Sequence, residues 1–181
     1  MIVGAYGNDG AGGTAGHARI YEWNGTTWNQ LGADIDGEAA GDQSGWSVAM
    51  SGNGNRVIVG ARFNDGNNSN SGQVRMYQWS GSAWVQMGAD IDGESALDQF
   101  GYAVSMNDAG DRIAVGAINN DGNNSNSGHV RIYSWNGTSW GQVGADIDGE
   151  AGGDQSGYAV SLNAAGDKVV IGAASNDAGN F

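Results

Sequence analysis

The residues best suited to chemistry lie in an acidic loop that occurs three times. It reads GADIDGEAAGDQSG from Gly32, GADIDGESALDQFG from Gly88 and GADIDGEAGGDQSG from Gly144. Calcium binds six to eight oxygen ligands, and carboxylates are prominent among them. The candidate calcium ligands are Asp34, Asp36, Glu38 and Asp42, then Asp90, Asp92, Glu94 and Asp98, then Asp146, Asp148, Glu150 and Asp154.

The spacing fits an EF-hand loop only in part. With Asp34 as the first ligand, the other carboxylates of that copy fall at the third, fifth and ninth positions. Its glycine comes too early, and Gly45 stands where a bidentate Glu is needed. The other interpretation is a loop between two sheets, in which Asp caps turns, Ile35 fills a gap and Glu38 is solvated. The sequence leaves both interpretations open, and calcium is the one cofactor it suggests.

Four sequons lie in segments rich in Asn, Gly and Ser, which favour turns. They are Asn24-Gly25-Thr26, Asn67-Asn68-Ser69, Asn123-Asn124-Ser125 and Asn136-Gly137-Thr138. A glycan on the side-chain amide of a sequon asparagine needs a surface loop in a secreted protein. Asn24, Asn67, Asn123 and Asn136 are therefore candidate glycosylation sites.

Two tryptophan positions recur and flank a short turn: Trp23, Trp79 and Trp135, and Trp28, Trp84 and Trp140. Aromatic pairs directly opposite each other stabilise a β-hairpin, and we expect these pairs to do so. Flat aromatic faces also stack on sugars, which leaves a lectin-like surface as an alternative.

Arginine and histidine also recur in the repeat. Arg19, Arg75 and Arg131 share one position, and a salt bridge to an acidic loop of a neighbouring sheet is the simplest interpretation. The two histidines, His17 and His129, share another position and form no catalytic constellation. Active sites usually break local regularity, and the carboxylates are all periodic. We therefore expect a non-catalytic protein.

These residues are positioned by a repeat of 56 residues. The segments Ile2–Ala5, Ile58–Ala61, Ala114–Ala117 and Val170–Ala173 share one register without insertions. Within one period, residues 46–50, 56–61, 73–79 and 83–87 have the β-branched and aromatic composition of strands. No segment has a helical period.

Four short strands per repeat indicate propeller blades. We expect an all-β fold, a β-propeller-type array of four-stranded antiparallel blades with about three blades in this chain. Apolar residues fall on both faces of residues 73–79, which requires a neighbouring blade on each side. We expect one repeat domain over residues 1–181: a partial blade at 1–31, repeats at 32–87 and 88–143, and a partial repeat at 144–181.

One period, QFGYAVSMNDAGDRIAVGAINNDGNNSNSGHVRIYSW, resembles the FG-GAP repeat of integrin α-chain-type β-propellers. Phe100-Gly101 stands at the FG, Val115-Gly116-Ala117 at the GA of the second word, and residues 128–133 at the Gly-x-Val-x-Val-Tyr strand. Proline is absent, and short turns replace the family's usual calcium loop. The resemblance implies a propeller architecture and an extracellular, non-catalytic role in adhesion or binding.

Composition limits the partners. The formal net charge is −13, which would repel nucleic acid. No apolar run reaches the length of a membrane helix, so we expect no membrane insertion. Without cysteine there is no disulfide framework.

The unfinished blades at both ends expose strand edges, which favour pairing with another chain. We expect an extracellular or cell-surface structural or adhesion protein that associates with itself head to tail, as a homo-oligomer or fibre, or that continues into further blades of a longer chain. The alternative is a lectin-like module that binds a glycan or a surface protein.

Overall fold

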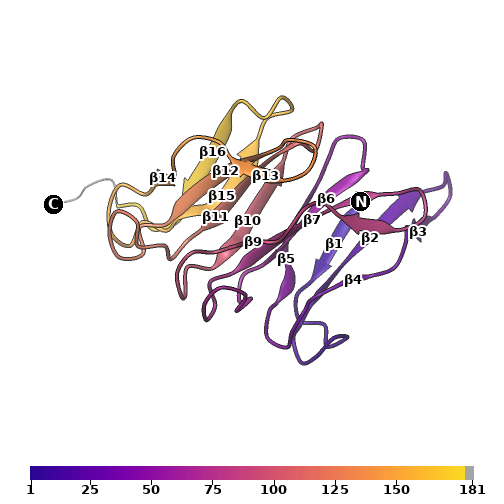
Figure 1. The fold of residues 1–181 in the computed structure, drawn as a ribbon, viewed down its shortest axis with the longest axis horizontal. Coiled ribbons are helices and arrows are strands. Elements are labelled where there is room, and N and C mark those ends of the chain that lie inside the picture. The colour runs from indigo at the N-terminus through magenta and orange to yellow at the C-terminus, as the bar shows by residue number, and fades with distance from the viewer. Residues whose placement is uncertain (178–181) are drawn as a thin grey trace.

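The computed structural model describes residues 1–177, within which every regular element is a β-strand. The strands form four sheets that follow one another along the long axis of the molecule (Figure 1). We call them blades 1 to 4. The array is open, and its all-β architecture confirms the expected fold. The last four residues of the partial repeat 144–181 lie outside the described residues.

Blade 1 contains β1 (Ile2–Ala5), β2 (His17–Trp23), β3 (Trp28–Gln30) and β4 (Ile35–Asp36). Blade 2 contains β5 (Ser44–Met50), β6 (Arg56–Ala61), β7 (Gln73–Trp79), β8 (Trp84–Gln86) and β9 (Ile91–Asp92). Blade 3 contains β10 (Phe100–Met106), β11 (Arg112–Ala117), β12 (His129–Trp135), β13 (Trp140–Gln142) and β14 (Ile147–Asp148). Blade 4 contains β15 (Ser156–Leu162) and β16 (Val169–Ala173).

Each complete blade is an antiparallel meander whose fourth strand is broken. In blade 2 the order is β5-β6-β7-β8, and β9 also pairs with β7. Residues 77–79 of β7 face β8, whereas Gln73 and Val74 face β9. The sequence suggested that the whole acidic segment is a loop. In the structure its Ile-Asp pair instead forms a short strand at the edge of the sheet.

In blades 2, 3 and 4 the first strand begins two residues before the expected start at position 46 or its equivalent. Ser44 already pairs with Ala61 of β6, and an irregularity follows before Ser47 pairs with Gly60. Ser44 also forms a parallel bridge with Gly16 of blade 1. This bridge links consecutive blades at the start of the strand.

The hydrophobic core lies between the blades. One cluster joins blades 1 and 2, with Ile20, Ile35 and Tyr77 among its members. A second cluster joins blades 2 and 3 and contains Met76 and Phe100. β7 thus contributes Tyr77 to one cluster and Met76 to the other, which confirms that it buries apolar residues on both faces. Each fully buried aliphatic side chain contributes about 1.5–3 kcal/mol.

Glycine permits the closest approach between blades. A Cβ atom on Gly116 of β11 would collide with backbone atoms of Gly157 on β15. Gly60 of β6 faces Gly101 of β10 in the same way. The recurring Gly-Ala pair therefore lets the strands of neighbouring blades approach at backbone distance, as predicted.

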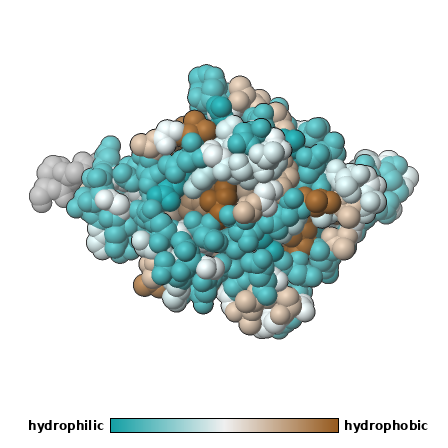
Figure 2. Space-filling view, in the orientation of Figure 1, coloured by the Kyte–Doolittle hydropathy of each residue, from teal (hydrophilic) through white to brown (hydrophobic). Residues whose placement is uncertain are grey.

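The surface seen in Figure 2 is largely hydrophilic, with hydrophobic residues in separate spots. Within residues 1–177 there is no helix that is long and apolar enough to span a membrane.

Candidate functional site

The acidic loop lies along the third strand of its own blade. Asp92 and Ile91 pair with Gln73 and Val74, and the equivalent pairing occurs in blades 1 and 3. The residues that follow this short strand reach toward the next blade. The acidic loop is therefore positioned to contact two blades at once.

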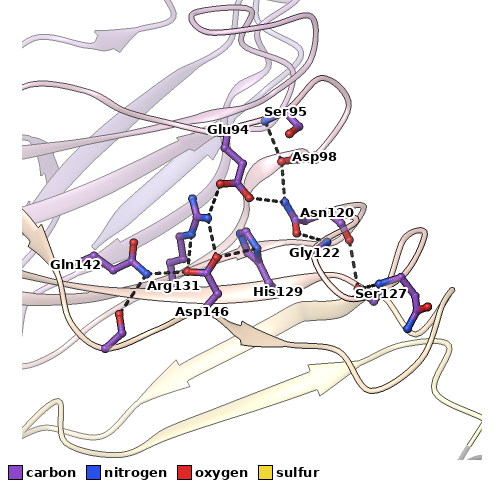
Figure 3. A network of polar contacts seen from close by, with 12 residues as sticks. Glu94, Ser95, Asp98, Asn120, Gly122, Ser127, His129, Arg131, Gln142 and Asp146 are labelled. Atoms are coloured by element: carbon purple, nitrogen blue, oxygen red, sulfur yellow. Dashed lines mark hydrogen bonds and ion pairs between the residues drawn. The ribbon is translucent and has the colours of Figure 1, made fainter.

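The fullest polar network lies between blades 2 and 3 (Figure 3). Arg131 on β12 donates through Nη2 to Glu94 Oε2 at 2.6 Å and to Asp146 Oδ2 at 2.7 Å. Its Nε donates to Asp146 Oδ1 at 2.9 Å. Glu94 belongs to the acidic loop of blade 2, whereas Asp146 belongs to that of blade 3. One guanidinium therefore links two blades with charge-assisted bonds, which confirms the predicted interblade salt bridge.

The same bridge is looser between blades 1 and 2. Arg75 Nη1 lies 3.5 Å from Glu38 Oε1, and Arg75 Nη2 donates to the carbonyl oxygen of Asp36 at 2.7 Å. Gln73 donates to Glu38 Oε2 at 3.2 Å. Glu38 is therefore an interblade partner and not only a solvated side chain. Arg19 on blade 1 bonds Asp34 of its own blade.

The fourth carboxylate of each acidic loop stabilises a turn and accepts a bond from an asparagine. Asp98 Oδ2 accepts from the backbone N–H of Ser95 at 3.1 Å and from Asn120 Nδ2 at 2.9 Å. Asn120 also donates to Glu94 Oε1 at 3.0 Å. The equivalent bonds join Asn64 to Asp42 and Asn176 to Asp154. These carboxylates are buried and structural in role.

Sequence reasoning missed these asparagines. The Asn-Asp-Gly segments indicate a turn, and they do form one, because Asn120 Oδ1 accepts from the N–H of Gly122 at 2.8 Å. The amide nitrogen of the same side chain donates to the acidic loop of the preceding blade. The sequence does hold a signal for this bond, because both the asparagine and the fourth carboxylate recur every 56 residues.

His129 lies beside this network but takes part in none of its hydrogen bonds. Its side chain is 1% exposed, and neither ring nitrogen has a hydrogen-bond partner among the described residues. Nδ1 lies 3.8 Å from Asp146 Oδ2. Burial lowers the pKa of His129, and the charge of Arg131 lowers it further. The neutral imidazole is therefore favoured.

Arginine controls the ionisation of its acidic partners. Hydrogen bonds from Arg131 lower the pKa of both Asp146 and Glu94. The hydrogen bond from Arg19 lowers the pKa of Asp34 to about 2. Burial has the opposite effect at Asp98, whose pKa it raises. Asp34, Asp146 and Glu94 are therefore anions at neutral pH.

The structure distributes the four carboxylates of a loop and does not gather them at one point. In the described residues, the groups that could hold a metal are His17, Asp34 and Asp36, and Glu94, His129 and Asp146. Each group contains a carboxylate bonded to arginine, and each includes imidazole, which suits zinc better than calcium. Asp90 accepts from Gln86, Asp92 lies in β9, and Asp148 and Glu150 are exposed.

The four sequon asparagines are exposed. Asn24 Oδ1 accepts from the backbone N–H groups of Thr26 and Thr27. The Nδ2 atoms of Asn67 and Asn123, to which a glycan would attach, donate to the carbonyl oxygens of Gly93 and Gly149. Asn136 Nδ2 donates to Ser139 Oγ. Of the four, Asn24 has its amide nitrogen free among the described residues.

The tryptophan pairs link blades as well as hairpins. The pairs lie opposite each other on adjacent strands, with ring centroids 5.3–5.5 Å apart. This confirms the predicted cross-strand pairs. Trp84 Nε1 also donates to the carbonyl oxygen of Leu31 at 2.8 Å, and Trp140 Nε1 to that of Met87 at 3.0 Å. Both bonds cross between blades.

Comparison with known proteins agrees with this architecture. A search among curated proteins found no significant match. The family model of the FG-GAP repeat matches residues 34–77 and 90–133. Each matched stretch extends from an acidic loop through the first two strands of the following blade and into its third strand. By these two matches and the sheets that they form, the chain contains FG-GAP repeats.

Proposed function

We propose that this protein is a non-catalytic structural or adhesion protein of the extracellular space or cell surface, and that it associates with itself through the open faces of its end blades. FG-GAP repeats occur in adhesion and integrin-like proteins, which are typically extracellular or on the cell surface. The polar networks support a structural role, because their charged groups bond to one another both within a blade and across blade boundaries.

One observation carries the self-association. Val170 on blade 4 is 73% exposed, whereas Ile58 and Ala114, at the same repeat position, are fully buried. Likewise, Val3 on blade 1 is 42% exposed and its equivalent Val115 is fully buried. Covering such apolar side chains is favourable, and a further blade covers them in the interior of the array. Head-to-tail contacts would form a ring or a fibre, depending on the rotation from one copy to the next.

Light scattering after size exclusion, over a range of concentrations, tests this proposal. We expect assemblies that grow with concentration. A compact monomer at every concentration would contradict self-association. Protease treatment of intact source cells tests the location, because a surface protein would be digested and an internal one would survive.

The alternative is a lectin-like binding module, and the exposed rings of Trp23 and Trp28 favour it. Binding to a glycan array, with quenching of tryptophan fluorescence that Trp23→Ala abolishes, would support the alternative. A change in tryptophan fluorescence on self-association, without any added glycan, would support the first proposal.

A further inference from the structure

A cluster of metal-ligating groups lies at the boundary between blades 2 and 3 (Figure 3). One ligand atom each from Glu94, His129 and Asp146 lies within 4.8 Å of the other two. Glu94 comes from the acidic loop of blade 2, whereas His129 begins β12 and Asp146 belongs to the acidic loop of blade 3. An ion held by all three groups would therefore join the two blades.

His129 is the member of this cluster that the fold leaves unsatisfied. Its side chain is 1% exposed, and neither ring nitrogen has a hydrogen-bond partner among the described residues. A buried polar group without a partner costs stability, so a ligand for the ring would be favourable. Nδ1 lies 3.8 Å from Asp146 Oδ2, close to the separation of about 3.4 Å between two ligands of a tetrahedral zinc ion. Burial lowers the pKa of His129, which favours the neutral imidazole that binds metals.

The charges around the imidazole favour a divalent cation. Asp146, Glu94 and Asp98 interact electrostatically with His129, and so does Arg131. When the carboxylates are ionised, three negative charges stand against one positive charge, and a divalent cation would neutralise the difference. The imidazole nitrogen favours zinc over calcium, which binds oxygen ligands.

Both carboxylates of the cluster keep a free position for a metal. Asp146 Oδ2 accepts one bond among the described residues, from Arg131 Nη2. Each oxygen of Glu94 also accepts one, from Asn120 or from Arg131. Because a carboxylate oxygen has two lone pairs, a metal can bind without removing the guanidinium. The side chains of Asp146 and Glu94 are 26% and 47% exposed, so an ion can reach the cluster from solvent.

The second cluster, which consists of His17, Asp34 and Asp36, differs in this respect. Asp34 Oδ1 accepts from Gln30 and from Arg19 Nε, and Asp34 Oδ2 accepts from Nε and Nη2 of Arg19. These four bonds occupy the lone pairs of the carboxylate. His17 is therefore a matched control within the same chain.

We propose that Glu94, His129 and Asp146 form a zinc site that links blade 2 to blade 3, with water as the fourth ligand. The site goes beyond the structural role proposed above, because it makes the strength of this blade boundary depend on a metal. Zinc adds a second link to the one that the guanidinium of Arg131 already forms between the same blades. Since both are cations, Arg131 limits the affinity of the site for zinc.

Calorimetric titration of the chelator-treated chain with zinc chloride tests the site. His129→Gln should weaken zinc binding at least about tenfold, because it removes the nitrogen ligand, and Gln73 at the same repeat position shows that glutamine fits there. His17→Gln should leave the affinity unchanged. No zinc binding, or equal affinities of the two histidine variants, would overturn the proposal.

Thermal unfolding tests the link between the blades. Zinc at about a hundred times its dissociation constant should raise the melting temperature of the native chain by about 5–10 °C. The same zinc concentration should leave the melting temperature of His129→Gln nearly unchanged. An equal rise in both chains would mean that zinc binds elsewhere and would overturn the site.

Arg131→Met separates the metal site from the salt bridge. Without the competing cation, zinc should bind at least about threefold more tightly, and it should restore part of the stability that this variant loses. Weaker binding would mean that the carboxylates need the guanidinium to hold them, and would overturn a site in which Arg131 competes with the metal. If this variant does not fold, His129→Gln decides.

Discussion

Arg131 Nη2 lies 2.6 Å from Glu94 Oε2, and the two residues belong to different blades. The guanidinium also bonds Asp146 in its own blade at 2.7 Å. Arg131 therefore bonds the acidic loop of its own blade and the acidic loop of the preceding blade. The first prediction concerns this double role.

Arg131→Met should destabilise the chain by about 2 kcal/mol, because it leaves two carboxylates without their cation in a partly buried site. Arg19→Met is the matched control, since Arg19 is more exposed and bonds only Asp34. It should cost clearly less, because an exposed ion pair is screened by solvent. Urea unfolding of both variants measures the difference. Equal losses would mean that the contact to Glu94 contributes nothing.

His129→Gln should flatten the pH dependence of stability just below neutrality. The folded pKa of His129 is lowered by burial, so the unfolded chain takes up its proton first. Stability is then complete above about pH 6.5 and is lost as the pH falls below it. Gln73 at the same repeat position shows that glutamine fits there. Urea midpoints at several pH values, for native chain and variant, measure the effect, and parallel curves would contradict it.

Acid should weaken the chain again at lower pH. Arginine lowers the pKa of Asp34, Asp146 and Glu94 in the folded chain. Their bonds therefore stabilise the fold fully above the unfolded pKa of about 4. This stabilisation is lost as the pH falls toward the folded pKa values. Asp34→Asn removes one such group and should reduce the loss between about pH 4 and pH 2. Thermal unfolding over that range tests this, and an unchanged loss would exclude Asp34.

Trp140→Phe should destabilise the chain by about 1 kcal/mol, since the carbonyl oxygen of Met87 loses its indole donor. Trp28→Phe removes an indole N–H that has no acceptor in the described residues, so the stability of the dilute chain should not change. It should weaken association instead. Unfolding at low concentration and sedimentation at high concentration separate the two effects, and a stability loss from Trp28→Phe would contradict the assignment.

Gly116→Ala should loosen blade 4 at a cost of about 1–3 kcal/mol, because the methyl group meets the backbone of Gly157. Gly172→Ala, at the same repeat position, has its nearest contact at 3.5 Å from Ala159 and should be tolerated. Hydrogen exchange across β15 and β16 reports on the docking of the blade. Equal protection in the two variants would mean that the close approach at Gly116 is not required.

The strands and the period were predictable because they depend on local pattern. Alternating apolar residues in Gln73–Trp79 indicated two buried faces, and the structure has both. The recurring arginine indicated an interblade salt bridge, because unlike charges at one period meet when blades stack. These inferences need only the repeat and the charge of each side chain.

The rest depends on where loops lie in three dimensions. The pairing of Ile91–Asp92 with β7 has too few residues to show a strand pattern. The bond between Asn120 and Asp98 joins residues 22 positions apart in different blades, and both types are common in isolated turns. The four carboxylates are distributed among arginine, glutamine and asparagine partners because of these positions. Their spacing in the sequence, taken alone, resembles a metal-binding loop.

The contacts between blades also set how the array responds to force. Each blade contacts mainly its neighbours, so a pull along the stack loads the boundaries between blades in series, and the weakest boundary yields first. The boundary between blades 1 and 2 has an arginine–glutamate distance of 3.5 Å, against 2.6 Å between blades 2 and 3. Of these two boundaries, we therefore expect the one at Arg75 to open first under tension, while blades 2 and 3 stay together.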